Sequence, residues 1–132
     1  MSICADKDWT MDLVKDNESP NEKETFNFRD IRVVNGVLTG RVYDAKNLHY
    51  SYLWGSCFSL GPVAHMTFFF TAVNDTKYVD IVLSGVGFQL PGEQPRFNGR
   101  FEVLERPSQL QSEVPTGFDP GDTGTGTGMQ AM

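Results

Sequence analysis

The stretch from Val33 to Val103 limits what this chain can fold into more than any other part of the sequence. Short runs of β-branched and aromatic residues follow one another there, and Gly, Pro, Asn or Asp separates each run from the next. The densest part, residues 63–73, reads VAHMTFFFTAV. This composition is typical of pleated, half-buried strands joined by turns, and no segment has a helical period of useful length. The sequence therefore predicts an all-β protein.

The turn residues divide the chain into seven predicted strands. Asn35-Gly36 is the strongest hairpin signal, because both residues tolerate the positive φ of a type I′ turn. The apolar alternation of the second strand changes phase near Arg29-Asp30, which predicts a bulge. Even spacing of short strands favours an antiparallel up-and-down β-barrel of seven or eight strands, because closure removes exposed sheet edges. The predicted strands cover residues 9–14, 25–34, 37–43, 49–60, 63–73, 77–90 and 96–104.

The two ends of the chain differ in composition from the barrel domain, which we place at residues 9–106. Residues 1–8 form a polar lead-in. Residues 107–132 have few large apolar side chains and contain the repeat GDTGTGTG, so we expect a low-complexity tail that is disordered or loosely attached. The glycines of this repeat do not indicate a phosphate loop, because no predicted strand precedes them and no helix follows.

Charge and targeting signals narrow the class of partner. The 132-residue chain has a formal net charge of −6, which argues against binding to nucleic acid or to anionic membranes. No apolar run is long enough for a transmembrane helix, and no signal peptide is visible. Cys4 and Cys57 do not form a disulfide framework by spacing, and pairing between them stays open. We expect a soluble protein, cytoplasmic unless a secretion leader has been removed.

Three short motifs within residues 36–103 resemble the avidin and streptavidin family. Residues 36–43 (GVLTGRVY) are similar to the family's G-x-L-T-G-x-Y hairpin strand, with one extra residue before the tyrosine. Residues 52–56 (YLWGS), and 83–85 (LSG) followed by 96–101 (RFNGRF), resemble later strands of the family. The resemblance implies a calycin-type barrel with aromatic walls around a ligand at one end. The family's polar biotin contacts are not matched, and Met11, Val79 and Ile81 stand at three of those positions.

The preferred functional hypothesis is a barrel that binds a small, largely apolar or aromatic ligand at one open end, without a cofactor. The resemblance places Phe70 and Phe101 at two of the family's wall positions. Several other aromatic side chains lie on strands that would also line such a pocket. The candidate ligand-binding residues are Tyr43, Tyr52, Trp54, Phe68, Phe70 and Phe101.

Two other hypotheses use the same barrel. Lipocalin-like and allene-oxide-cyclase-like barrels have similar patterns, and the second type suggests a cofactor-free cyclase or isomerase. Asp80 would be its acid or base, provided that this side chain points into the barrel rather than out to solvent. The third hypothesis is an oligomeric structural or interaction barrel whose interior is filled by its own side chains. For the ligand-binding barrel, too, the expected oligomer is a homodimer or homotetramer. His49 and His65 lack further ligands at metal spacing, so we expect no metal site.

Overall fold

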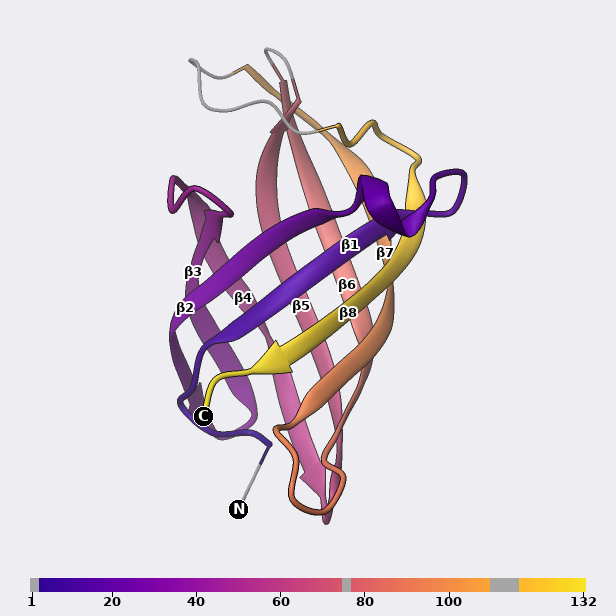
Figure 1. Ribbon diagram of the computed structural model, residues 1–132. Helices are drawn as coiled ribbons and strands as arrows, with labels where there is room; N and C mark the ends of the chain where they lie inside the picture. Colours follow the sequence, from indigo (N-terminus) through magenta and orange to yellow (C-terminus); the bar gives the residue numbers. More distant parts are fainter. Residues whose placement is uncertain (1–2, 75–76, 110–116) are drawn as a thin grey trace.

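The structure, a computed structural model, describes residues 3–74, 77–109 and 117–132. Eight antiparallel strands close into a barrel in chain order, and β8 pairs with β1 (Figure 1). This confirms the predicted all-β up-and-down barrel and sets the strand number at eight. No helix within the described residues is long and apolar enough to cross a membrane. The elements are β1 (Trp9–Lys15), a 3₁₀ turn (Pro20–Glu22), β2 (Glu24–Val34), β3 (Val37–Asp44), β4 (His49–Leu60), β5 (Val63–Asn74), β6 (Lys77–Phe88), β7 (Arg96–Gln109) and β8 (Thr123–Gln130).

Two turns have the residues that their backbone angles require. Asn35 and Gly36 adopt φ values of 51° and 81°, which confirms the predicted hairpin between β2 and β3. The next turn is held by Asp44, whose carboxylate oxygen Oδ1 accepts hydrogen bonds from the backbone N–H groups of Lys46 (2.9 Å) and Leu48 (2.7 Å). Short polar side chains close turns in this way because they replace a backbone acceptor.

The predicted bulge in β2 is also confirmed. The register between β2 and β3 shifts between Arg29 and Arg32, and Asp30 has a left-handed φ of 56°. Phe28 and Ile31 are both buried although they stand three residues apart, which regular alternation forbids. The extra residue therefore restores the inward face of the strand after its phase change.

The disordered tail predicted for residues 107–132 is wrong wherever the structure describes it. β7 continues to Gln109 and β8 closes the barrel between β7 and β1, while residues 110–116 lie outside the described part. The repeat of threonine and glycine is a strand with glycines inside and threonines outside. A Cβ atom at Gly124 would collide with the carbonyl oxygen of Val14, so this strand needs glycine for close approach. The low-complexity sequence of β8 is therefore explained by the close packing of its glycines against neighbouring strands.

Seven phenylalanine rings fill the barrel from its lower end, where the chain termini lie in Figure 1, to its upper end. Each ring is at most 2% exposed, and neighbouring ring centroids are 5.1 to 6.1 Å apart. The interior is therefore a packed aromatic core, at separations at which aromatic rings attract. In order of contact the rings belong to Phe97, Phe68, Phe28, Phe70, Phe26, Phe118 and Phe101.

The N-terminal segment covers the lower end of the barrel. Although its composition is mostly polar, it buries one apolar side chain in the core. Ile3 is only 1% exposed, and its carbonyl oxygen accepts a hydrogen bond of 2.8 Å from Nε2 of Gln130 on β8. Cys4 forms a disulfide with Cys57 on β4, across a sequence separation of 53 residues. The sequence left this pairing open. The structure shows that it ties the lead-in to the barrel wall.

A charged clasp on the outside joins the end of β1 to β7 and β8. The two terminal guanidinium nitrogens of Arg100 donate to the carboxylate of Asp16, at 2.8 and 2.6 Å, and the Thr123 hydroxyl donates to the same carboxylate at 2.7 Å. The hydrogen bonds from Arg100, followed by that from Thr123, lower the pKa of Asp16 from 3.8 to about 2. Hydrogen bonds to a charged carboxylate favour that form.

Arg100→Ala is expected to return the pKa of Asp16 toward 3.8, measured by NMR titration of its carboxyl carbon. Because the folded pKa is the lower one, the clasp contributes stability above the unfolded pKa. That contribution is lost as the pH falls from about 4 through about 2. Arg41→Ala, which removes a distant exposed guanidinium on β3, should leave the titration of Asp16 unchanged. A wild-type Asp16 that titrates near 3.8 would contradict the clasp.

Candidate functional site

One buried side chain near the upper end of the barrel comes from outside the eight strands. Phe118 comes from the segment between β7 and β8, and its ring is 1% exposed although Gly117 and Asp119 beside it are exposed. The ring centroid lies 5.5 Å from that of Phe101 in an edge-to-face contact and 6.1 Å from that of Phe26. A buried ring on an irregular surface segment is held by its own contacts more than by regular backbone pairing. Among the seven core rings, Phe118 is the one that lies outside the eight strands.

A small charged pocket of about 40 Å³, which we call the mouth, has Phe118 as one of its lining residues. The Lys15 ammonium donates to the Gly117 carbonyl oxygen at 2.8 Å and pairs with Glu18 at 2.7 Å. Its hydrogen bond with Glu18 is the main cause that raises the pKa of Lys15. Glu24 accepts a hydrogen bond of 3.2 Å from the Gly117 backbone N–H. The Lys15 ammonium also pairs with Asp122 at 3.6 Å. Glu18, Glu22 and Glu24 line the mouth with this single ammonium, so the mouth favours positive charge. It is lined by Leu13, Lys15, Glu18, Glu22, Glu24, Gly117 and Phe118.

The six predicted ligand-binding residues do not line one pocket. Three are buried in the aromatic core, where Phe70 and Phe101 lie in the upper half, and Phe68 packs between Phe28 and Phe97. The other three point outward from β3 and β4. The outward ones are Tyr43, half-buried beneath the Arg29 guanidinium, and Tyr52 and Trp54, which are 62% and 57% exposed.

The position of Asp80 does not meet the condition of the cyclase hypothesis. Val79 and Ile81 on either side are buried in the core, so the half-buried Asp80 points away from the interior. Its carboxylate oxygen Oδ1 accepts a hydrogen bond of 2.9 Å from the Thr71 hydroxyl on the neighbouring strand β5. This contact joins two neighbouring strands on the outer side of the barrel wall, where Thr71 is itself buried. We therefore do not propose acid–base chemistry at Asp80.

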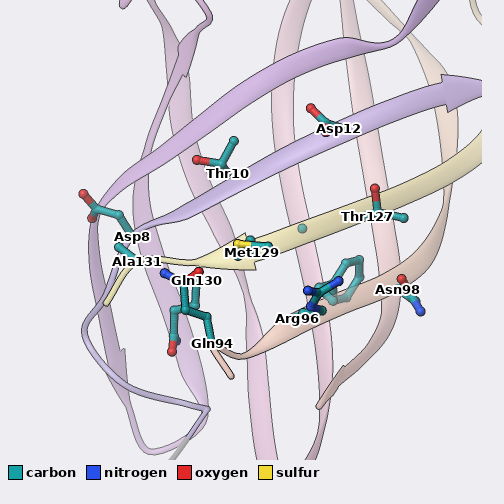
Figure 2. Close-up of a pocket in the computed structure, with 12 residues that line it drawn as sticks. Asp8, Thr10, Asp12, Gln94, Arg96, Asn98, Thr127, Met129, Gln130 and Ala131 are labelled. Atoms are coloured by element: carbon teal, nitrogen blue, oxygen red, sulfur yellow. The ribbon is translucent and has the colours of Figure 1, made fainter. Parts of the chain in front are cut away.

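A larger depression, of about 580 Å³, lies on the outside of the barrel over β8, between β1 and β7 (Figure 2). Thr10 and Asp12 form its β1 wall, but both side chains are engaged with β2. The Thr10 hydroxyl donates to Asn27 at 3.2 Å, and Asp12 accepts from the Thr25 hydroxyl at 2.6 Å. Thr10 and Asp12 therefore already have partners on the neighbouring strand. Elsewhere in residues 3–74, 77–109 and 117–132, no cluster of His, Cys, Asp and Glu is arranged to hold a metal.

Sequence reasoning missed Phe118 because this residue lies in the segment predicted to be disordered. One signal was present: Phe118 is the only aromatic residue after Phe101. A single large ring in a polar segment that follows a barrel is a candidate for insertion into the core, since burial of such a ring contributes about 1.5–3 kcal/mol.

Comparisons with protein-family models, with characterised proteins and with solved structures give no significant match to this chain. The closed eight-stranded antiparallel barrel agrees with the fold that the avidin-like motifs led us to expect. Membership of that family stays a prediction from the three motifs.

Proposed function

We propose that the protein is a non-catalytic binding barrel that holds a small aromatic ligand with a positively charged tip at its upper end. The ligand ring takes the place of the Phe118 ring, which moves out to the surface. The observation that carries the proposal is a core ring supplied by an exposed surface segment beneath a carboxylate-rich mouth.

The space that Phe118 would vacate has the chemistry of an aromatic site. Leu13, Phe26 and Phe101 surround the ring, and none of them is more than 2% exposed. Apolar cavities of about 150 Å³ in protein cores stay dry and bind benzene. A one-ring or two-ring ligand is therefore the class that fits, with edge-to-face contacts like those that Phe118 makes.

The mouth selects the charge of the ligand. Glu18, Glu22 and Glu24 together outnumber the single ammonium of Lys15 at the point where a ligand tip would emerge. A cationic amine can replace the Lys15 ammonium as partner of these carboxylates, whereas an anionic tip would be repelled.

The affinity of the wild-type protein includes the cost of moving Phe118 into water. Exposure of a buried phenylalanine costs about 1.5–3 kcal/mol. Each 1.4 kcal/mol is a tenfold change in affinity, so the wild type should bind about 10–150-fold more weakly than a variant without the ring.

Three probes with the same ring system and different tips test the proposal: indole, tryptamine and indole-3-acetate. Phe118→Ala is expected to bind all three, tryptamine most tightly and indole-3-acetate most weakly, in isothermal titration calorimetry. Wild type should show the same order at lower affinity. Glu18→Gln combined with Glu22→Gln should remove the preference for tryptamine and leave indole affinity unchanged. Glu93→Gln, an exposed carboxylate between β6 and β7, is the matched control.

Two outcomes would overturn the proposal. If wild type binds none of the probes while Phe118→Ala binds them, the ring is a permanent part of the core. If Phe118→Ala folds, as judged by circular dichroism, but binds none of the probes, the vacated space is not a ligand site.

The interaction barrel is a second candidate function, and the packed interior favours it. Seven buried rings leave the inside of the barrel occupied in this state, whereas several large apolar side chains remain on the outside. In that function the outer surface of the barrel contacts the partner.

The disulfide is evidence about the cellular compartment of the protein. Disulfides persist in oxidising compartments and are reduced in the cytosol. The Cys4–Cys57 bond therefore favours an oxidising compartment over the cytoplasm expected from the sequence.

A further inference from the structure

One wall of the barrel carries exposed aromatic side chains outside the aromatic core. We call it the aromatic face and define it by the outward residues Tyr52, Trp54 and Phe58 on β4 and Phe69 on β5. Their exposed fractions are 62%, 57%, 57% and 37%. β4, β5 and β6 are each 12 residues long and run side by side in Figure 1. Contiguous apolar patches of this kind on soluble proteins mark interaction sites.

Strand register arranges the aromatic face into two ridges with a furrow between them. Trp54, Phe69 and Val82 lie in one row across β4, β5 and β6. The row two residues away along the strands contains only small hydroxyl side chains, from Ser56, Thr67 and Ser84. The hydroxyls of Ser56 and Thr67 are 2.7 Å apart and hydrogen-bonded to each other.

A second row of large side chains, the second ridge, lies on the other side of the furrow formed by Ser56, Thr67 and Ser84. Phe58, His65 and Val86 form the next row across the same three strands. Large and small rows therefore alternate along the wall at about 7 Å intervals, the two-residue repeat of a strand. A surface of this form is complementary to itself, since a ridge of one copy fits the furrow of another around a twofold axis.

The charges on the aromatic face permit two copies to meet. The chain carries a net charge of −6, yet the three rows across β4, β5 and β6 contain no carboxylate, and His65 is their only ionisable side chain. The bordering carboxylates are Glu102, which pairs with Val82 at the end of one row, and Asp80, which pairs with Thr71. The centre of the face can therefore pack against a second copy without burying carboxylates, while Glu102 and Asp80 stay at the rim, where interfaces are polar and reached by water.

The size of the aromatic face matches what a dimer needs. Four aromatic side chains of roughly 200 Å² each, about half exposed, leave on the order of 400 Å² of ring surface in water. The exposed neighbours Val37, Leu60, Val63 and Val86 extend the patch. Together they approach the roughly 800 Å² that each partner contributes to a standard interface.

We infer that the aromatic face is the interface of a homodimer, in which the Trp54–Phe69–Val82 ridge of each copy packs into the Ser56–Thr67–Ser84 furrow of the other. The barrel is closed, so its described strands present no free edge for pairing with another chain. Face-to-face packing of sheets, about 10 Å apart, is the arrangement that remains. This inference is independent of ligand binding at Phe118.

Analytical ultracentrifugation of the full chain tests the interface. Wild type is expected to sediment with twice the 14.8 kDa mass of one chain and to dissociate on dilution. Phe69→Glu should be monomeric at the same concentration, with a dissociation constant raised at least ~100-fold, because a buried carboxylate without a partner loses its hydration. Met129→Glu is the matched control: Met129 is an exposed apolar residue on β8, so this variant should remain dimeric.

Tryptophan fluorescence on dilution gives a second readout that needs no variant. Trp9 is buried in the core and Trp54 is on the aromatic face, so dissociation should shift the emission of Trp54 alone to longer wavelength. Wild type that is monomeric at millimolar concentration would overturn the inference. So would a dimer that persists in folded Phe69→Glu, or a dimer whose dissociation leaves the emission unchanged.

Discussion

Replacement of Cys4 by serine is expected to lower the free energy of unfolding by about 4 kcal/mol, which is a large part of the stability of a small domain. The Cys4–Cys57 disulfide closes a loop of 53 residues in the unfolded chain and so removes much of its conformational freedom. The substitution is best made at Cys4, which is half-buried, because serine at the buried Cys57 would add an unsatisfied hydroxyl.

The native state also depends on this bond for the closure of its lower end. Cys4 follows Ile3, which is buried against the inner face of the barrel, and the disulfide holds this short segment to β4. Without the bond, the hydrogen bond from Gln130 to Ile3 is the polar contact that still holds Ile3 in place. We expect the N-terminal segment to exchange amide hydrogens faster in Cys4→Ser than in wild type.

Urea unfolding with and without reductant measures the effect. Reductant should lower the stability of wild type to that of Cys4→Ser and should leave Cys4→Ser itself unchanged. Equal stability of oxidised and reduced wild type would show that the bond does not form or does not contribute.

The second large effect is a difference in unfolding free energy between alanine substitutions at two neighbouring phenylalanines. Phe68→Ala is expected to cost about 3–5 kcal/mol of unfolding free energy, the range for loss of a buried ring. Phe69→Ala should cost less than about 1 kcal/mol in the monomer, as surface substitutions do. Phe68 is fully buried and contacts Phe28 and Phe97 at centroid distances of 5.2 and 5.4 Å, whereas Phe69 is 37% exposed.

Denaturant unfolding of both variants at low protein concentration, where dimerisation does not contribute, gives the comparison. The two substitutions remove the same atoms from adjacent residues, so each is the control for the other. Equal losses of stability would mean that β5 does not present alternate residues to the two sides of the barrel wall.

The sequence by itself determined the strands and most turns, because these depend on local properties. β-branched and aromatic runs predicted seven strands, and Asn35-Gly36 predicted its hairpin. The phase change near Arg29-Asp30 predicted the bulge. The eighth strand was missed because its alternating threonines and glycines lack the large residues that signal a strand. Its inner face is small because side chains from other strands, such as Phe101 at Gly124, occupy the space.

Only the tertiary structure decided which side of each strand faces inward and what closes the two ends. Period-two alternation places Tyr52 and Trp54 on one face of β4 and Leu53 and Cys57 on the other, but both faces are apolar enough to be buried. Contacts between distant segments settle the choice, and the same contacts bring Ile3 and Phe118 to opposite ends of the core. Such contacts depend on barrel closure, which no local pattern encodes. The sequence thus fixes the walls of the barrel, and packing fixes its inside, its ends and its exposed aromatic face.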